Sequence, residues 1–162
     1  MARVSLKRGK EMTANVIFSS LQIEPTESQI GDINALLKQL TSKPKEVNRV
    51  VLNEILSQSG VSILLVKNSE DRIIAMATLA VRRLLLNKTA IIGDVVVDEQ
   101  HRGMKLGKRM MEFLINKARE EKVLFISLTS HPHREAANHM YQSLGFELIG
   151  KVGESNYYRL PL

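Results

Sequence analysis

The stretch that decides the fold is "DEQHRGMKLGKRM", residues 98–110, which directly follows the apolar run "AIIGDVVV", residues 90–97. The apolar run predicts a strand, and the segment that begins at residue 106 has the apolar spacing of a helix. The quoted stretch has two glycines, four lysines or arginines and no proline. A junction of strand, glycine-containing loop and helix directs backbone N–H groups toward one point, which suits a phosphate group.

Two common phosphate-binding motifs do not fit this junction. Gly103 and Gly107 are separated by three residues, whereas a P-loop needs four. Arg109 follows Lys108 where a P-loop has the Ser or Thr that binds magnesium. The dinucleotide pattern G-x-G-x-x-G is also absent from the stretch. A third kind of phosphate loop is therefore needed.

The whole chain limits the class of protein. Its 162 residues favour one domain with a real core, and its fractions of 44% hydrophobic and 25% charged residues are typical of globular proteins. It contains no cysteine, which excludes a disulfide scaffold, a cysteine-ligated metal and a cysteine nucleophile. No apolar run approaches the roughly 20 residues of a membrane span, and the N-terminus lacks the apolar part of a secretory signal. We expect a cytoplasmic protein.

The formal net charge of +6 favours anionic partners. Part of this charge lies in the N-terminal segment, where Arg3, Lys7, Arg8 and Lys10 fall within the first ten residues. We expect residues 1–13 to be a disordered basic tail and residues 14–162 to form the domain. A solvated cationic tail is favoured over an arm that binds nucleic acid.

The remaining pattern predicts a mixed α/β fold. Thr26 with Gln29 three residues later is a capping box at the start of a helix. Apolar spacing and turn residues predict strands at 15–25, 123–130, 146–152 and 156–162, helices at 26–42, 44–60, 106–122 and 134–145, and a strand meander at 61–98 with turns at 67–71 and 87–88. The alternation of strands and helices after residue 90 favours parallel pairing there, whereas the first half is antiparallel.

Two segments resemble the GNAT superfamily of acyl-CoA-dependent N-acetyltransferases. The family's phosphate loop follows Arg/Gln-x-x-Gly-x-Gly/Ala, and here Arg102 and Gly107 match its ends while Lys105 replaces the middle glycine. The hexosamine-phosphate branch of the family also accepts a longer side chain there. We expect the loop to bend at Gly103 and Gly107 and Lys105 to contribute its backbone N–H. The segment 126–147 resembles the later signature Ala-x-x-x-Tyr-x-x-x-Gly-Phe.

The resemblance implies a central, mostly antiparallel mixed sheet with a splayed parallel strand pair and flanking helices. It implies an N-acetyltransferase that moves an acetyl group from acetyl-CoA, as co-substrate, to a primary amine in a ternary complex. No metal is expected. The cofactor-binding residues implied by the family's motifs are Val95, Val96, Val97, Arg102, Gly103, Met104, Lys105, Leu106, Gly107, Lys108 and Asn138.

Two residues are candidates for catalysis. Tyr141 matches the family's general acid, which would protonate the departing thiolate. Asp94 is the single carboxylate in the apolar strand, and burying it unpaired would be costly. In the hexosamine-phosphate branch an acidic pair stands at this place, whereas this chain has Gly93–Asp94. Asp94 could bind the amine or relay its proton, and the alternative is that it caps a loop or pairs with an arginine.

A second class of function stays open: a catalytically silent CoA-binding or nucleic-acid-binding regulatory module. The aromatic fraction of 4% and the presence of both signature segments favour the enzyme. We expect an amine-bearing acceptor, either a small molecule or a protein N-terminus, and neither nucleic acid nor membrane as partner; a homodimer is left open. His131 and His133 are read as loop residues, and Arg82 and Arg83 as a solvated pair in preference to an anion site.

Overall fold

The computed structural model describes residues 15–162, so the predicted disorder of residues 1–13 lies outside the described residues. The elements in chain order are β1 (Ile17–Ser20), α1 (Glu27–Leu40), α2 (Arg49–Leu56), β2 (Val61–Lys67), β3 (Ile73–Arg83), β4 (Lys88–Val97), a 3-10 turn (Glu99–His101), α3 (Leu106–Glu120), β5 (Phe125–Ser130), α4 (Glu135–Ser143), β6 (Glu147–Val152) and β7 (Ser155–Pro161).

Local side-chain contacts set the starts of the first two helices. Thr26 Oγ1 accepts from the backbone N–H of Gln29 (3.2 Å), and Gln29 Oε1 accepts from that of Thr26 (2.9 Å), which confirms the capping box. The second helix begins five residues later than predicted because Asn48 caps it. The segment before it is held against α1, since the Asn34 amide exchanges two hydrogen bonds with the backbone of Val47.

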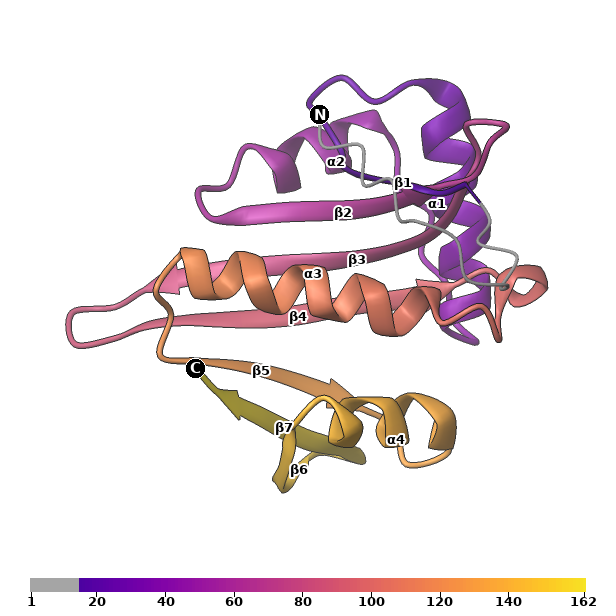
Figure 1. Ribbon diagram of the computed structural model, residues 1–162. Coiled ribbons are helices and arrows are strands. Elements are labelled where there is room, and N and C mark those ends of the chain that lie inside the picture. Colours follow the sequence, from indigo (N-terminus) through magenta and orange to yellow (C-terminus); the bar gives the residue numbers. More distant parts are fainter. Residues whose placement is uncertain (1–14) are drawn as a thin grey trace.

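The seven strands form one sheet in the order β1-β2-β3-β4-β5-β7-β6. All neighbouring strands are antiparallel except β4 and β5, which run parallel, as the mixed fold class predicts. The parallel pairing covers only Ala90 with Ile126 and Ile91 with Ser127. Beyond these pairs the two strands diverge toward the end of the sheet at which α3 begins (Figure 1). The predicted splayed pair is thus confirmed.

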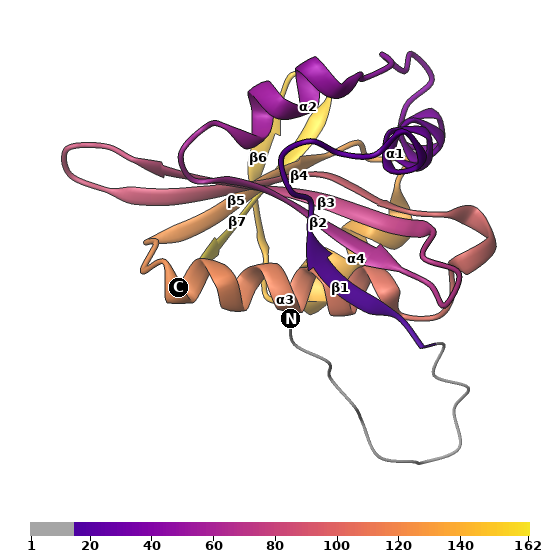
Figure 2. The ribbon, with the colours of Figure 1, turned by 90° about the horizontal axis from the view of Figure 1, so that it is seen from above.

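Helices cover both faces of the sheet. Figure 2 shows α1 and α2 on one face and α3 and α4 on the other. The larger core lies under α3, where its buried side chains meet those of β5 and β7; examples are Met110, Met111, Leu114, Ile126 and Tyr158. The smaller core lies under α1 and α2. The buried carboxylate of Asp32 fixes α1 to the start of β3, because it accepts from Arg72 Nε (2.9 Å) and Ile73 N (2.9 Å).

The hairpin between β3 and β4 projects beyond the helices (Figure 1). Its turn lies at residues 84–87 and not at the predicted 87–88, because Leu84 N donates to Asn87 O (2.7 Å). Leu85 at the tip is fully exposed. None of the helices in the described part of the chain combines the length and apolar character that a bilayer crossing requires.

Candidate functional site

A β-bulge interrupts β4 just beyond the point where β4 and β5 separate. The register with β3 shifts there, so that Asp94 and Val95 together lie opposite Ala77. Asp94 takes the left-handed conformation, with φ 50°. A bulge leaves one residue outside the hydrogen-bond ladder. Backbone groups of β4 are therefore available to a ligand beside the gap between the strands.

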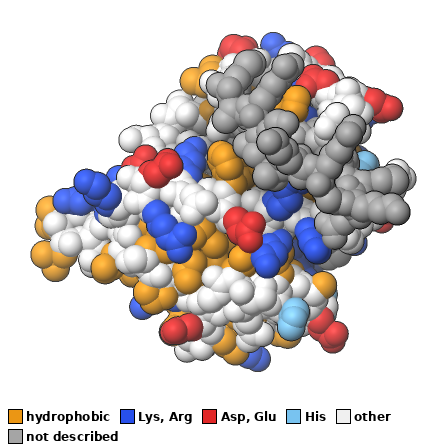
Figure 3. Space-filling view, viewed as in Figure 1, with side chains coloured by type: hydrophobic (Ala, Val, Ile, Leu, Met, Phe, Trp, Pro, Cys, Tyr) orange, Lys and Arg blue, Asp and Glu red, His pale blue; other side chains and the backbone are white. Residues whose placement is uncertain are grey.

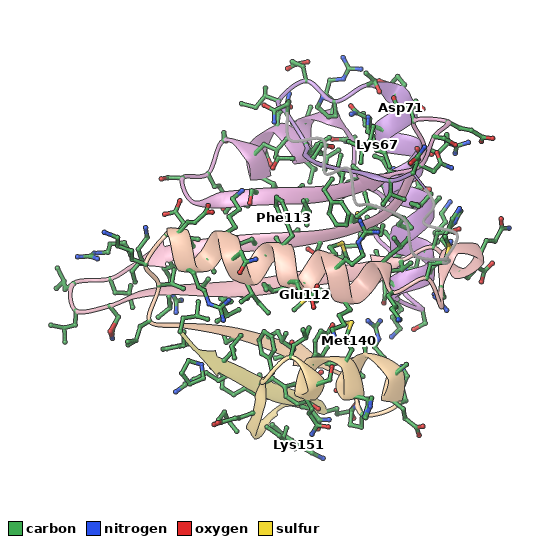
Figure 4. All side chains as sticks on the ribbon, viewed as in Figure 1. Lys67, Asp71, Glu112, Phe113, Met140 and Lys151 are labelled. Carbon is green, nitrogen blue, oxygen red and sulfur yellow. The ribbon has the colours of Figure 1, made fainter. Side chains whose placement is uncertain are left out.

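The loop between β4 and α3 bends at Gly103 (φ 80°) and Lys105 (φ 58°). The predicted bend at Gly103 is confirmed, but the predicted bend at Gly107 is wrong, because Gly107 lies in the first turn of α3. A Cβ at Gly107 would lie 3.4 Å from Met140 Sδ and 3.6 Å from Val97 Cγ2. Both are ordinary contact distances, so a Cβ would fit at this position beside Met140, which lies between α3 and α4 (Figure 4). Lys105 instead adopts a conformation that costs a non-glycine residue about 1 kcal/mol.

The N-terminus of α3 is suited to an anion. The first backbone bond of the helix runs from Arg109 N to Lys105 O (3.1 Å), so the N–H groups of residues 106–108 have no carbonyl one turn earlier. The N-cap residue, Lys105, has no side-chain acceptor, whereas α1 and α2 are capped by oxygen atoms of Thr26 and Asn48. The first turn contains no acidic residue. Lys and Arg side chains gather over this half of α3 (Figure 3), which adds to its positive end.

A cleft of about 1010 Å³ lies between this helix end, β4, the C-terminal end of α1 and the start of α4. Nine of the eleven predicted cofactor residues line it: Val95, Val96, Val97, Arg102, Gly103, Lys105, Leu106, Gly107 and Lys108. Met104 and Asn138 are not part of the lining. Arg102 also donates through Nε to the carbonyl of Val97 (3.2 Å), so its side chain holds the loop against the end of β4.

A second cavity of about 270 Å³ adjoins the cleft. Asp94 lines it together with residues at the ends of β5 and β7, among them Thr129, Ser130 and Ser155. Five residues line both spaces: Leu40, Thr41, Val95, Arg134 and Tyr141. The two cavities therefore meet at the β4 bulge and the Tyr141 side chain.

The exit of α4 fixes the position of Tyr141. Phe146 N donates to the carbonyl of Tyr141 (3.1 Å) and Gly145 N to that of Gln142 (3.0 Å), with Gly145 at φ 91°. These two bonds form a Schellman motif, in which Gly145 takes the left-handed C′ position. The ring packs against those of Phe146 and Tyr158, with both centroids 6.0 Å away. Tyr141 is only 5% exposed, so its ring has little freedom to move.

Burial controls the protonation state of Tyr141. Loss of solvent raises the pKa of its hydroxyl to about 12, and the nearby charge of Arg134 offsets only part of this rise. A raised phenol pKa favours the neutral form, so the hydroxyl keeps its proton at neutral pH. Arg134 also donates to the carbonyl of Leu40, which joins the start of α4 to the end of α1. Sequence reasoning missed Arg134, because the two partners lie 94 positions apart and no motif marks them.

Asn138 holds the loop that leads into α4. Its Nδ2 donates to the carbonyls of His131 (2.8 Å) and Arg134 (2.9 Å), and the residue is 8% exposed. The amide nitrogen is thus engaged with the chain itself. Asn138 shapes the boundary of the cleft through this loop and does not line the cleft.

The surroundings of Asp94 differ from those expected of a carboxylate in an apolar strand. Asp94 is exposed, and the bulge turns it out of the sheet. Its Oδ2 accepts from Thr78 Oγ1 (3.0 Å). Asp94 is therefore not the buried charge that the sequence predicts, and that prediction is wrong. Within residues 15–162 no arginine forms an ion pair with it. Its place on the smaller cavity is what favours a functional role.

A second link joins α1 to the loop between β4 and α3. Gln39 Nε2 donates to Asp98 Oδ1 (2.8 Å), and Gln39 Oε1 accepts from Glu99 N (2.9 Å). His101 Nδ1 lies 2.6 Å from Asp98 Oδ2. The hydrogen bond from Gln39, together with His101, holds the pKa of Asp98 below its usual range. No sequence motif marks this link, because Gln39 and Asp98 lie 59 positions apart.

The two loop histidines stack on each other. The ring centroids of His131 and His133 are 5.4 Å apart. In the part of the chain that the structure describes, no three His, Cys, Asp or Glu side chains converge as metal ligands would.

Comparison with known proteins connects this geometry to a family. The model of the acetyltransferase (GNAT) family matches residues 32–146. No curated protein sequence matches the chain. A chain of the NatC complex, solved bound to Gag peptide and CoA, is 21% identical and superposes with a TM-score of 0.73, covering 91% of this chain and 98% of that one.

Two further solved structures have the same fold. A GNAT-family acetyltransferase from Staphylococcus aureus MU50 is 19% identical, with a TM-score of 0.72 over 91% of this chain and 99% of that one. Glucosamine-6-phosphate N-acetyltransferase from Arabidopsis thaliana is 24% identical, with a TM-score of 0.71 over 85% of this chain and 95% of that one. At these identities the likeness is one of fold.

The left-handed conformation of Lys105 leads to a test of the loop. Lys105→Gly should leave CoA affinity close to wild type, because glycine keeps the bend. Lys105→Val should weaken it about tenfold or more, because a β-branched residue resists positive φ. Titration calorimetry with CoA measures both. Lys122→Val is the matched control, since Lys122 is also left-handed (φ 54°) but lies outside the cleft lining. An equal loss in Lys105→Gly would assign the effect to the side chain and not to the bend.

Proposed function

The chain belongs to the acetyltransferase (GNAT) family, and from this premise we propose that it transfers the acetyl group of acetyl-CoA directly to a primary amine. The observation that carries the proposal is the meeting of two cavities at Val95 and Tyr141. The larger cavity has the volume of a cofactor-sized site. The smaller one takes the acceptor, so donor and acceptor meet at the β4 bulge.

The α3 end of the larger cleft would hold the CoA pyrophosphate. The N–H groups of residues 106–108 are directed there, and Lys108 and Arg109 add positive charge. Arg102 keeps the loop in register with β4 through its bond to Val97. Val95–Val97 have no partner in β5, so their backbone would pair with the extended arm that leads to the thioester. Asn138 acts through the loop it supports, in place of the cofactor contact that the sequence predicts.

Acetyl-CoA supplies an activated acyl group on a thiol of pKa about 8.5. The backbone of Val95 at the bulge can donate to the carbonyl oxygen as negative charge develops there. The Tyr141 hydroxyl, at the junction of the cavities, can donate to the departing sulfur. With the phenol pKa near 12, complete transfer of its proton to a thiolate is uphill by about 5 kcal/mol. Donation of a strong hydrogen bond, completed as the C–S bond breaks, is the role this residue can fill.

The acceptor amine must be neutral when it attacks, although a free primary amine titrates near 10. Asp94 lies on the acceptor side and is exposed, so it can bind the ammonium form and pass its proton to water. The acceptor itself is open. One structural neighbour was solved with Gag peptide and another acts on glucosamine 6-phosphate, so peptides and amino sugars both belong in an acceptor panel.

Binding of the co-substrate is expected to stabilise the protein. A ligand that binds only the native state raises the free energy of unfolding by mass action, by about 2.7 kcal/mol at a concentration of 100 times Kd, and the melting temperature rises with it. Differential scanning fluorimetry with CoA, ATP and NAD at equal concentration measures the effect. We expect a clear shift with CoA and a much smaller one with ATP or NAD. Equal shifts in melting temperature with CoA, ATP and NAD would mean that the N-terminus of α3 binds any anion by charge and does not select CoA.

Tyr141→Phe should lower kcat about 10²-fold, because it removes the donor to the leaving sulfur and almost no packing area. Release of free thiol from acetyl-CoA measures the rate, and the loss should shrink with a more acidic thiol as leaving group. Tyr158→Phe is the matched control, since Tyr158 is buried in the same ring cluster but lines neither cavity. A wild-type rate in Tyr141→Phe would mean that Tyr141 packs in the core and takes no part in catalysis.

Asp94→Asn should lower kcat/KM for the amine at neutral pH about tenfold or more, with CoA affinity unchanged. Asparagine keeps the left-handed bend and the acceptor for Thr78, so only the charge is lost. Asp71→Asn is the control, since Asp71 is also left-handed but pairs with Lys67 on the β2–β3 turn (Figure 4). Steady-state kinetics between pH 6 and 9 measure this difference. If Asp94→Asn and the wild type have the same pH profile of kcat/KM, Asp94 has no role in the mechanism.

A further inference from the structure

The strands next to the smaller cavity carry a group of polar side chains on the face opposite α3 and α4. Tyr158 and Leu160 of β7 are buried in the core under α3. Tyr157 and Arg159 alternate with them along the strand and therefore face the other way. On β5 the same alternation turns Ser127 and Thr129 to that face. Thr129 lies opposite Tyr157 in the register, and Ser127 lies opposite Arg159.

This group continues from the acceptor cavity. Thr129 is part of the cavity lining, and Ser127 is the next residue of β5 on the same face. Two to three residues along a strand span about 7–10 Å. Arg159 lines neither cavity, but it lies opposite Ser127, which is two residues along β5 from the cavity residue Thr129. An acceptor that extends from the cavity by about this distance would reach it.

Two aromatic rings hold Arg159 in place. Its guanidinium carbon is 4.3 Å from the centroid of the Phe125 ring and 5.8 Å from that of Tyr157. Nη2 donates to the Tyr157 hydroxyl (3.4 Å). Nε is buried and has no hydrogen-bond partner among residues 15–162. Contacts with two rings and the bond to the Tyr157 hydroxyl restrict the rotation of the guanidinium, so its remaining donors have a fixed direction.

The positive charge of this group is not neutralised by the described residues. Arg82 of β3 lies on the same face of the sheet, because Leu79 and Val81 of that strand pack into the core under α3 and Arg82 alternates with them. A hydrogen bond from Arg159, one with Ser127 and the charges of Arg159 and Arg82 lower the pKa of the Tyr157 phenol. Within residues 15–162, neither arginine has a carboxylate at ion-pair distance. Glu147, which is opposite Arg159 in the register, is exposed and forms no such pair.

We propose that Arg159 and Arg82 bind an anionic group of the acceptor, so that this enzyme acts on amines that also carry a carboxylate or a phosphate. The inference rests on the proposed function and names the substrate class of its smaller cavity. Asp94 and the two arginines then recognise opposite charges at the two ends of one molecule. This replaces the solvated pair that the sequence predicts for Arg82, whereas Arg83 keeps that role because it alternates to the other face.

Matched acceptors test the proposal. The series is linear ω-amino carboxylates of increasing length, the ω-amino carboxamides of the same lengths, and aminoalkyl phosphates. We expect kcat/KM for the anionic members to exceed that of the carboxamides about tenfold or more, with an optimum length at which amine and anion are about 7–10 Å apart. The carboxylate and phosphate arms distinguish the two anions.

Variants of the arginines test which residues cause the preference for anionic acceptors over carboxamides. Arg159→Gln should remove most of the preference while kcat/KM for the carboxamides changes little, and Arg82→Gln should reduce it. Arg83→Gln, an equal loss of charge on the neighbouring position, should have no effect. Arg159→Lys controls for folding, because it keeps the charge and loses only the planar fork, and it should retain part of the preference. Equal use of charged and neutral acceptors, or an equal loss on both in Arg159→Gln, would overturn the proposal.

A binding measurement separates this proposal from the proposed function. Titration calorimetry of the best-fitting ω-amino carboxylate and its carboxamide, with CoA present, needs no turnover. Tighter binding of the carboxylate that is lost in Arg159→Gln supports the anion site even if no thiol is released with any amine. Thiol release with neutral amines and no preference in binding would support the transferase and refute the anion site.

Discussion

The parallel pairing of β4 and β5 stops after two residue pairs, and the rest of the site depends on this early end. Backbone N–H and C=O groups need partners when they are buried, so two strands that separate inside a protein leave groups for something else to satisfy. The bulge at Asp94 and Val95 turns further backbone groups out of the ladder at the same level. The sheet therefore has unpaired backbone groups at its centre, next to two cavities that meet at Tyr141.

Contacts between distant segments keep this gap open and shaped. The C-terminal end of α1 lies across it and is joined to α4 by the bond from Arg134 to Leu40, and to the phosphate loop by Gln39 and Asp98. The buried Asp32 fixes α1 to β3 at another point of the helix. Because α1 and α4 cover opposite faces of the sheet (Figure 2), these bonds hold the two faces together at the site.

Charge is distributed along the site in a consistent order. The positive end of α3 lies on the larger cleft, Asp94 lies on the smaller cavity, and Arg159 lies opposite Ser127 of the strand that supplies part of the cavity wall. A buried, protonated Tyr141 stands at the middle, where the low dielectric strengthens a hydrogen bond to a developing anion. This order suits a phosphorylated donor and a zwitterionic acceptor that meet at the bulge.

The sequence by itself determined the features that depend on residues a few positions apart. The capping box at Thr26 and the Schellman motif at Gly145 and Phe146 were readable, because each is closed within one helical turn. The order of strands and helices and the presence of a loop before α3 could also be predicted, because each follows from the pattern of neighbouring residues. Only the tertiary structure decided which residue of that loop bends, because α3 begins at Leu106, which puts Gly107 inside the helix and the left-handed conformation on the N-cap residue, Lys105. It also turned Asp94 outward through a register shift against β3, and it used the Asn138 amide to support a loop. Arg134 and Arg159 acquire their surroundings from segments far away in the chain, and no local pattern encodes such contacts.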